Sequence, residues 1–513
     1  MDWLIMSDFP SFNRRSFIGS VIGAALVAQS GLSVANSAKA AVNDSSPPDE
    51  SLERTGTPKR VVILGAGLSG LTAGYELSRA GHDVTILEGN NRPGGRVHTL
   101  RGFPDDHYAE AGAGRIPPNH VWTRKYAAHL GLTLEPFGPT GLAHVYVVGG
   151  KRIVATPQTD LLPYFDFTPA EKQLGIPGMM QKYIGEPMQS FVAAADDLWS
   201  ADWPPAALRE FDGSSFFDFL RKRGASSGFV EFFQMGAIPR DMSALTIFRM
   251  LAMSELREES KIRGGNDLLP KALADKLSGK IIYGARVLQF DQTSSGTSVN
   301  FERNGSRSHL TADSIVCALP FSVLRTLQTP SFSPLKRTAI AQLKYTQVVR
   351  VALPTATRFW EREQLSGFAD LDTSASIWSP TWNQPGASGI LQLYQMGPLA
   401  ARLDTLSPTE RLQSASATVA SAFPGLQPDF DRSVEFSWQR NEWSRGAFSD
   451  LQPGQPFAWG SAVAQPEGRI HFAGEHASAC PAWMQGALSS GYRAAREVNS
   501  ADYRQGRRER MAS

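Results

Sequence analysis

The hydrophobic pattern is most informative where a short apolar run gives way to helical spacing and then to a second run. Val61–Leu64 is an uninterrupted apolar run with the length and β-branched content of a buried parallel strand. Apolar residues then recur at helical spacing over Leu71–Ala80, and Gly81 stands where a helix C-cap belongs. Asp83–Leu87 predicts another strand, which ends at Glu88. The stretch therefore predicts strand, helix and strand in immediate succession.

The turn between the first strand and the helix carries the pattern G-x-G-x-x-G at Gly65, Gly67 and Gly70. Glycine allows a tight turn and lets a pyrophosphate approach the helix N-terminus, where free N–H groups and the macrodipole favour anions. Glu88 then stands where a carboxylate can accept hydrogen bonds from an adenosine ribose. Such turns also occur for purely steric reasons, but the flanking strands and Glu88 favour a dinucleotide site.

Beyond this unit, the hydrophobic pattern of the chain predicts a helical region followed by extended segments. Residues 118–255 are helical and aromatic, with amphipathic segments at Ala170–Leu174, Pro187–Leu198 and Ser214–Arg223. Strands are predicted at Ile281–Tyr283, Ala285–Phe290, Ser298–Phe301 and Asp313–Pro320, and residues 341–440 add strands and a helix. The chain thus predicts a mixed α/β protein.

Composition narrows the class of protein. The 513 residues are 42% hydrophobic and 19% charged, which suits a globular protein of two to four domains. A formal net charge of +2 gives no reason to expect nucleic acid or an anionic membrane as a partner. The two cysteines, Cys317 and Cys480, exclude a disulfide framework. No metal ligand is among the candidate site residues.

The N-terminus predicts an export signal. Asn13–Gly19 carries a twin arginine, Val21–Ala28 is apolar, and Ala38–Ala40 is an A-x-A cleavage site. The apolar part is too short for a membrane span. The pattern resembles a bacterial twin-arginine signal over residues 1–40, followed by a flexible lead-in at 41–57, and implies a periplasmic or secreted protein; a basic disordered tail is the alternative.

Two separated motifs carry a family resemblance. Arg92–Arg96 resembles the R-x-G-G-R of the flavin-containing amine oxidase family, and a nicotinamide enzyme is not expected to carry it. Arg469–His476 and Pro481–Ala495 resemble the family's C-terminal G-E-x-x…W-x-x-G-A-x-x-S-G-x-R-A-A. The resemblance implies FAD as cofactor and an α/β fold, in which a Rossmann-like FAD-binding domain of the GR2 type is joined to a mixed-sheet substrate domain and a helical insert.

By this resemblance the FAD-binding domain is assembled from three separated segments. They are residues 58–117, 256–328 and 456–500, with a helical and substrate-domain insert at 118–255, a substrate-binding domain at 329–455 and a tail at 501–513. The resemblance also implies which residues contact FAD. These are Gly65, Gly67, Leu68, Ser69, Gly70, Glu88, Gly89, Gly95, Arg96, Gly112, Ala113, Gly114, Arg115, Val287, Gly474, Glu475, Trp483, Met484 and Ala487. Ala447 stands where monoamine oxidases hold a flavin-bonded cysteine, so the FAD is predicted to be noncovalent.

The substrate side depends on an arginine. Residues 110–117 resemble the G-x-x-R-[IL]-P of L-amino acid oxidases, in which the arginine, here Arg115, pairs bidentately with the substrate carboxylate. A surface arginine or a salt bridge is the alternative. Where many of these oxidases have I-Y-Y-P, this chain has Trp378 and Ser379. Trp378, Ser379 or Tyr394 could replace the tyrosine that helps to hold the carboxylate.

Four further residues receive roles from the resemblance. Residues 332–340 resemble a motif whose lysine holds a water against flavin N5; the shortened spacing leaves Lys336 or Arg337 open, and a solvated lysine at a helix start is the alternative. Phe448 and Trp483 are predicted to flank the substrate amine, although two aromatic residues can equally be core. The carbonyl of Ala482 is predicted to accept a hydrogen bond from that amine.

The resemblance implies oxidative deamination of an L-amino acid by hydride transfer from Cα to flavin N5. Its products are a 2-oxo acid, ammonia and hydrogen peroxide, with dioxygen as acceptor. The alternatives are a monoamine or polyamine oxidase, an amino acid 2-monooxygenase of the same fold, and a flavin-loaded protein without turnover. The expected partners are a small-molecule substrate and a second copy of the chain in a homodimer.

Overall fold

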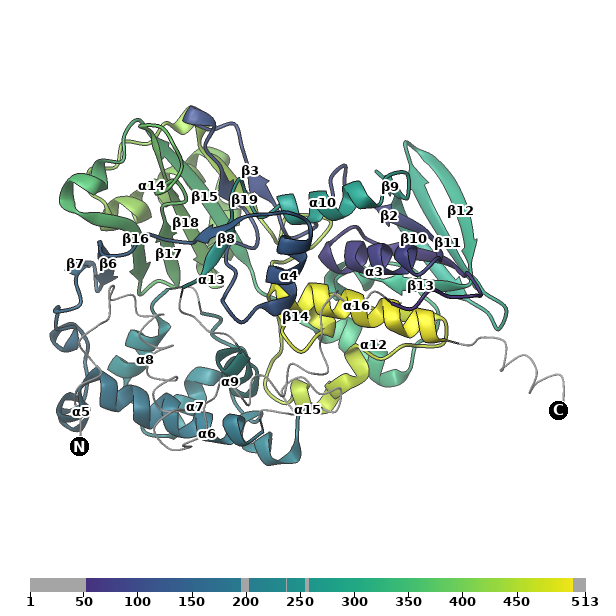
Figure 1. The fold of residues 1–513 in the computed structure, drawn as a ribbon. Helices are drawn as coiled ribbons and strands as arrows, with labels where there is room; N and C mark the ends of the chain where they lie inside the picture. Colours follow the sequence, from purple (N-terminus) through teal and green to yellow (C-terminus); the bar gives the residue numbers. More distant parts are fainter. Residues whose placement is uncertain (1–51, 195–202, 237, 254–257, 502–513) are drawn as a thin grey trace.

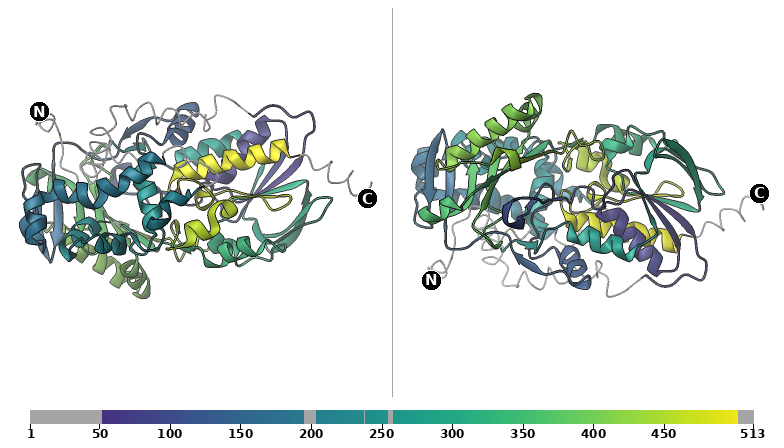
Figure 2. Two further views of the ribbon diagram at one scale, coloured as in Figure 1. Left: turned by 90° about the horizontal axis from the view of Figure 1, so that it is seen from below. Right: turned by 90° about the horizontal axis from the view of Figure 1, so that it is seen from above.

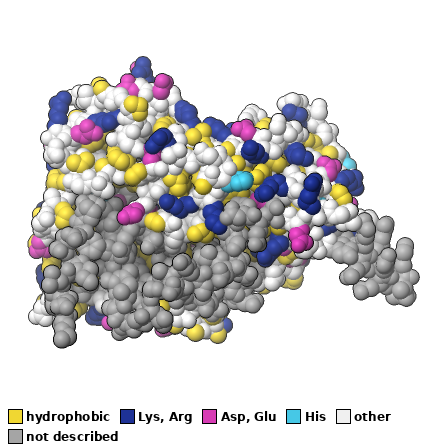
Figure 3. All heavy atoms as spheres, viewed as in Figure 1, with side chains coloured by type: hydrophobic (Ala, Val, Ile, Leu, Met, Phe, Trp, Pro, Cys, Tyr) yellow, Lys and Arg dark blue, Asp and Glu magenta, His cyan; other side chains and the backbone are white. Residues whose placement is uncertain are grey.

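A computed structural model describes residues 52–194, 203–236, 238–253 and 258–501 of the chain (Figure 1). The predicted export signal and most of the lead-in lie outside these residues. Within the described ranges, no helix is both long and apolar enough to cross a membrane. On the face that Figure 3 draws, the coloured part carries side chains of both charge signs with hydrophobic atoms between them.

A five-stranded sheet forms the centre of one lobe. Its strand order is β21-β13-β1-β2-β9, and every neighbouring pair is parallel. The strands are β1 (Arg60–Leu64), β2 (Asp83–Glu88), β9 (Ile281–Tyr283), β13 (Ser314–Cys317) and β21 (Ile470–Phe472). They come from separated parts of the chain, and they confirm the predicted Rossmann-like α/β domain.

The two faces of this sheet are covered differently, as both views in Figure 2 show. Val61 and Ile63 pack in one core with α3 (Leu68–Arg79), α10 (Leu268–Lys276) and α16 (Met484–Ser500). Val62 and Leu64 point to the opposite face and pack with β10 (Arg286–Gln292), β11 (Thr297–Arg303) and β12 (Ser306–Ala312). An uninterrupted apolar strand is required because alternate residues enter two separate cores.

The helix α16 closes this lobe by packing against α3. A Cβ at Gly491 of α16 would collide with the backbone oxygen of Ser69 in the first turn of α3. The missing side chain therefore allows two helices from opposite ends of the chain to approach closely. This contact fixes the N-terminal ends of both helices next to the same cavity, described below.

A seven-stranded mixed sheet forms the second lobe, in the order β19-β15-β18-β17-β16-β6-β7. Its strands are β6 (Ala143–Val148), β7 (Lys151–Ala155), β15 (Val348–Thr355), β16 (Leu365–Leu371), β17 (Ala375–Trp378), β18 (Gly389–Met396) and β19 (Val434–Ser437). β16 and β6 are parallel, and the other pairs are antiparallel. α13 (Pro398–Thr405) and α14 (Pro408–Ala422) pack on this sheet.

The helical region beneath this sheet in Figure 1 has an aromatic core. Its helices are α5 (Pro169–Met180), α6 (Glu186–Ala193), α7 (Phe216–Lys222), α8 (Ser227–Gln234) and α9 (Ala244–Met253). Fully buried rings such as Phe191 and Phe248 lie with centroids 5.5 Å apart, a distance at which aromatic pairs add stability beyond their buried area. The predicted helical insert is confirmed from α5 to α9. The expectation of helices throughout residues 118–255 is wrong at β6 and β7, which join the seven-stranded sheet.

Short elements join these parts. They are β3 (Thr99–Leu100), β4 (Ala109–Glu110), α4 (Val121–His129), β5 (Leu134–Pro136), β8 (Ser260–Ile262), α11 (Phe321–Leu324), α12 (Pro334–Gln342), β14 (Lys344–Tyr345), β20 (Ser449–Asp450) and α15 (Gln455–Trp459). β3 pairs with β4, and β5 pairs with β8. β4 and the turn after it lead from the first lobe toward the second.

Candidate active site

A long cavity runs from the carboxyl end of β1 to the seven-stranded sheet. At its first end lie Gly65, Gly67, Leu68 and Ser69, which form the turn into α3. The N-cap residue of α3, Gly67, has no side chain to cap the helix, and a Cβ there would meet nothing within 4 Å. Free backbone N–H groups at a helix N-terminus favour an anion such as a pyrophosphate.

Gly70 has a different role from the other glycines of the turn. It does not line the cavity, and a Cβ there would collide with the carbonyl oxygen of Gly65. Gly65 itself has a φ of +97°, which is readily adopted only by glycine. Gly70 therefore allows the turn to fold tightly onto the first turn of α3.

Glu88 follows β2 and lines the same end of the cavity. Its Oε2 accepts a hydrogen bond from the Ala66 N–H at 2.7 Å, and its Oε1 accepts one from the Asn90 N–H at 2.8 Å. Burial raises the pKa of this carboxyl, although both N–H groups oppose the shift. Each carboxylate oxygen keeps a second lone pair with which it can accept a ribose hydroxyl. Val287 lines this end as well.

An ion pair stands in the middle of the cavity. Nη1 of Arg96 lies 2.5 Å from Oε1 of Glu475, and it also donates to the Ala447 carbonyl at 3.2 Å. Glu475 further accepts hydrogen bonds from the Ser449 hydroxyl at 2.7 Å and from the Ala482 N–H at 2.8 Å. Burial alone would raise the pKa of Glu475, but Arg96 and the N–H and O–H donors leave it below its usual value.

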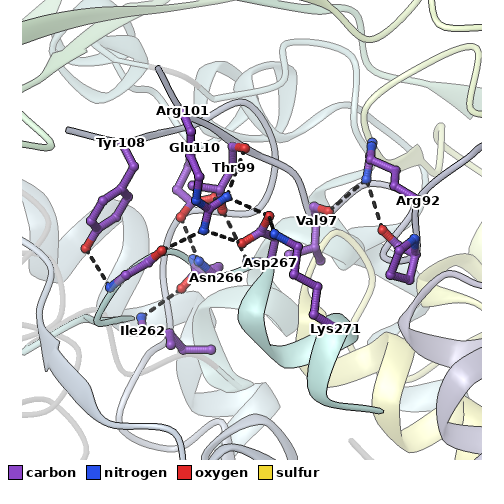
Figure 4. Close-up of polar contacts among 12 residues, drawn as sticks. Arg92, Val97, Thr99, Arg101, Tyr108, Glu110, Ile262, Asn266, Asp267 and Lys271 are labelled. Atoms are coloured by element: carbon purple, nitrogen blue, oxygen red, sulfur yellow. Dashed lines mark hydrogen bonds and ion pairs between the residues drawn. The ribbon is translucent and has the colours of Figure 1, made fainter. Parts of the chain in front are cut away.

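A polar network behind the cavity includes Thr99, Glu110 and Asn266, which Figure 4 draws. It holds the segment of residues 112–114, which lines the cavity. The Glu110 carboxylate accepts hydrogen bonds from the Thr99 hydroxyl and the Asn266 N–H, at 2.9 and 2.8 Å. The side-chain amide of Asn266 donates to the Ala113 carbonyl at 2.9 Å. These partners come from distant segments of the chain. The network therefore fixes the backbone just before Arg115, and with it the point from which the Arg115 side chain extends.

The N-terminus of α16 completes the cavity wall. Trp483, Met484 and Ala487 line the cavity, and the N-cap residue Trp483 makes no side-chain hydrogen bond to the helix start. The preceding residue, Ala482, has a φ of +68°, a left-handed conformation that costs a non-glycine residue free energy. The positive end of the α16 dipole therefore faces the cavity and favours negative charge there.

These features fit FAD along the whole cavity. The uncapped α3 suits a pyrophosphate, Glu88 suits a ribose, and the uncapped α16 suits a flavin edge that gains negative charge on reduction. Ala447 lines the cavity, and its methyl side chain offers no sulfur for a covalent link. The remaining predicted contacts also line the cavity. They are Gly89, Gly95 and Gly474.

The end of the cavity next to the seven-stranded sheet is aromatic and cationic. Arg115, Arg350, Trp378, Tyr394, Phe448 and Trp483 all line it. The Arg115 guanidinium carbon lies 5.6 Å from the ring centre of Trp378 and 5.4 Å from that of Trp483. Nη1 of Arg115 donates to Oε1 of Glu259 at 3.0 Å. Arg115 is thus both a cavity residue and a member of a salt bridge.

Lys336, like Gly70, is a predicted site residue that the structure places outside the cavity lining. It is buried in α12 and is absent from the cavity lining. Its Nζ donates to the carbonyls of Val463 and Gln465 at 3.1 and 2.8 Å, and it lies 3.5 Å from the ring centre of Phe472. We therefore assign Lys336 no contact with the cofactor. The Ser379 hydroxyl is buried and does not line the cavity either.

Two residues of this end were not found by sequence reasoning. Arg350 lies in the middle of β15, where all eight residues are buried. A charged residue inside an apolar run is itself a signal, because burying an unpaired charge is costly. No sequence pattern marks Glu259, because it follows a segment of mixed charge. Its pairing with Arg115, 144 positions earlier in the chain, is visible only in the folded structure.

Comparisons with known proteins agree with this geometry. The family model "Flavin containing amine oxidoreductase" matches residues 68–499. YobN of Bacillus subtilis (strain 168) is 32% identical over 469 residues, which cover 86% of this chain and 95% of YobN. The L-amino-acid oxidase of Demansia vestigiata is 29% identical over 480 residues, covering 89% and 90% of the two chains.

A solved structure shares the fold. Wild-type putrescine oxidase bound to putrescine superposes with a TM-score of 0.73 at 21% identity, covering 87% of this chain and all of that one. At this identity the likeness concerns the fold alone. Together with the family match, the cavity from α3 to α16 identifies the cofactor as FAD. The chain belongs to the family of flavin-containing amine oxidoreductases.

Proposed function

We propose that this oxidoreductase is an L-amino acid oxidase, which converts an L-amino acid, dioxygen and water to a 2-oxo acid, ammonia and hydrogen peroxide. The observation that carries the proposal is the presence of two arginines, Arg115 and Arg350, in an otherwise aromatic end of the cavity. A substrate that is only an amine makes no use of two guanidinium groups, whereas a carboxylate can accept hydrogen bonds from them. The relationship to the Demansia vestigiata L-amino-acid oxidase supports the same class.

When bound in this cavity, FAD would supply the acceptor for the hydride of the substrate Cα and the route by which the electrons reach dioxygen. The protein's share is to hold the substrate in position. Phe448 and Trp483 flank the amine, and the Ala482 carbonyl accepts a hydrogen bond from it. Trp378 contributes an aromatic wall beside both arginines, as its distances to their guanidinium groups indicate.

The cavity lining supports a substrate that reacts as a neutral amine. Among the described residues that line it, the only carboxylates are Glu88 and Glu475, and both already accept backbone N–H hydrogen bonds. Histidine and lysine are likewise missing from the described part of the lining. These described residues offer no free side-chain base, and the arrangement suits hydride transfer rather than proton abstraction by one of them.

The test is a product analysis. The purified holoenzyme is incubated with each of the twenty L-amino acids under air, and peroxide, ammonia and the 2-oxo acid are quantified. Equal amounts of all three support the proposal. An amide with loss of carbon dioxide identifies a 2-monooxygenase instead, and an enzyme active only on amines overturns the proposal.

We also propose export and a noncovalent cofactor. The twin arginine in Asn13–Gly19 and the A-x-A at Ala38–Ala40 support export through the twin-arginine route. The mature protein is then expected to start after Ala40, which N-terminal mass spectrometry of the extracytoplasmic fraction measures. Acid precipitation is expected to release all of the flavin, because Ala447 offers no linking atom. A homodimer is the expected assembly, and size-exclusion chromatography with light scattering tests it.

A further inference from the structure

The start of α4 is capped by a side chain that comes from α16. His120, the N-cap residue of α4, makes no side-chain hydrogen bond to its own helix. Instead, Oε1 of Gln485 accepts hydrogen bonds from the N–H groups of Trp122 and Thr123, at 3.0 and 3.2 Å. The first N–H groups of a helix have no partner within it. Gln485 lies in the first turn of α16, so one side chain joins the starts of two helices that pack together (Figure 1).

The polar group of Gln485 serves this contact and does not line the cofactor cavity. The residue is 0% exposed and is absent from the cavity lining. Its Nε2 has no hydrogen-bond partner in the described part of the chain. Both donors on α4 are backbone N–H groups, which can be met only by the amide oxygen. Because a buried amide is costly unless it is hydrogen-bonded, Gln485 holds α4 at a defined place against α16.

Residues 116–120, called the strap here, connect this contact to Arg115. The strap begins at Ile116, which exchanges two backbone hydrogen bonds with Ser260, at 2.7 and 2.8 Å. The next two residues are prolines, whose rings fix φ and limit the movement of the backbone. The strap then ends at the N-cap of α4. A shift of α4 is therefore passed along a stiff segment to the backbone that carries Arg115.

Both ends of the strap also contact Trp483, which lines the cavity two residues before Gln485. The His120 ring meets the Trp483 ring edge to face, with centroids 4.8 Å apart and an interplanar angle of 84°. Burial, with Arg115 and Arg124 nearby, lowers the pKa of His120 to about 3, so the ring is neutral at pH 7. At the other end, the Arg115 guanidinium carbon lies 5.4 Å from the centre of the Trp483 ring.

We propose that Gln485 is a positioning residue for the substrate end of the cavity: its hold on α4 fixes, through the strap, the spacing between Arg115 and Trp483. The inference rests on the proposed function, in which one substrate presents a carboxylate to Arg115 and an amine to Trp483. A residue that cannot accept the two N–H groups lets α4 and the strap move relative to α16. The two groups that hold one substrate then no longer fit it together.

The test compares Gln485→Met with Gln485→Glu in the holoenzyme, with KM and kcat per bound flavin measured separately for the preferred L-amino acid. Methionine fills a similar volume without an acceptor, so kcat/KM is expected to fall by about ten- to a hundredfold, with a raised KM. Glutamate keeps both acceptor bonds and places negative charge at a helix N-terminus, which favours it. Gln485→Glu is therefore expected to stay within about threefold of wild type.

Ser407→Ala is the matched control. The Ser407 hydroxyl caps α14 by accepting a hydrogen bond from the Glu410 N–H at 3.3 Å, outside the cavity lining. Because Gln485→Met and Ser407→Ala each remove a helix cap, both are expected to melt about 1–2 °C lower than wild type. Only Gln485→Met is expected to change KM.

Hydrogen exchange of the ligand-free holoenzyme gives a readout that does not depend on turnover. The backbone amides of residues 116–123 are expected to exchange faster in Gln485→Met than in wild type, because the strap and the start of α4 open more often. In Ser407→Ala the same amides are expected to exchange as in wild type.

The outcomes separate this inference from the proposed function. A Gln485→Met enzyme that keeps the wild-type KM and loses activity only in proportion to its flavin content overturns the inference, as does unchanged exchange over residues 116–123. A wild type that oxidises amines but no L-amino acid overturns the proposed function. In that case, faster exchange in Gln485→Met together with a raised KM for the amine still supports Gln485 as a positioning residue for Trp483.

Discussion

The ion pair between Arg96 and Glu475 offers the sharpest prediction about the cofactor cavity. The two side chains are 20% and 8% exposed, so neither charge is well solvated. Replacing Arg96 by Met keeps the apolar stem of the side chain and removes the cation. Glu475 then retains its bonds from Ser449 and Ala482 but loses the partner that offsets its burial.

The expected cost follows from that geometry. Removing one partner of a buried ion pair typically destabilises a protein by about 3–5 kcal/mol, because the other charge is left uncompensated. With about 2.1 cal/mol/K of unfolding entropy per residue, a chain of 513 residues has an unfolding entropy of about 1 kcal/mol/K. Arg96→Met should therefore lower the melting temperature by about 3–5 °C.

The assay is a double-mutant cycle of Arg96→Met, Glu475→Gln and the double variant, followed by thermal unfolding and flavin content. The double variant should be less destabilised than the sum of the single variants, since it leaves no buried carboxylate without a cation. The folded-state pKa of Glu475 is depressed, so the stabilisation is present above its ordinary value of 4.5 and is lost as the pH falls through the folded-state value. Additive effects at pH 7 would refute this reasoning.

Three further variants test separate features. Gly70→Ala should lower flavin content, because the new Cβ collides with the Gly65 carbonyl; Gly56→Ala, where a Cβ meets nothing within 4 Å, should leave it unchanged. Ala482→Gly should stabilise the protein by about 1 kcal/mol by relieving the positive φ, without changing KM; a lower melting temperature would count against strain there. Burial lowers the pKa of Lys336 to about 7, so wild-type stability relative to Lys336→Met should rise between pH 7 and pH 10, by up to about 1.4 kcal/mol per pH unit in thermal melts. A pH-independent difference would mean that Lys336 does not titrate differently on folding.

The dinucleotide unit could be predicted because its signals are local. The uninterrupted apolar run Val61–Leu64 requires burial on both faces, and the structure shows two different cores on the two faces of β1. The helix was expected at Leu71–Ala80 and is found at Leu68–Arg79. The pattern missed its first turn because that turn contains Gly70, and glycine has a weak helix propensity. The strand, the turn and the helix could thus be predicted because residues close together in the sequence determine each of them.

The substrate end could not be predicted in the same way, because it depends on long-range pairing. The register that places Arg350 opposite Tyr394 joins β15 to β18. Likewise, the parallel pairing of β6 with β16 joins segments more than two hundred residues apart, which no local pattern records. For Lys336, a motif with shortened spacing did not determine the direction of its side chain, and the structure turns it toward Val463 and Gln465.

The most direct test of the central claim compares an L-amino acid with the amine that lacks only its carboxylate. Steady-state kcat/KM is measured for the preferred L-amino acid and for its decarboxylated counterpart, with peroxide as the readout. A carboxylate bound by buried guanidinium groups predicts a preference of about ten- to a hundredfold or more for the amino acid. An equal or higher kcat/KM for the amine would contradict the account.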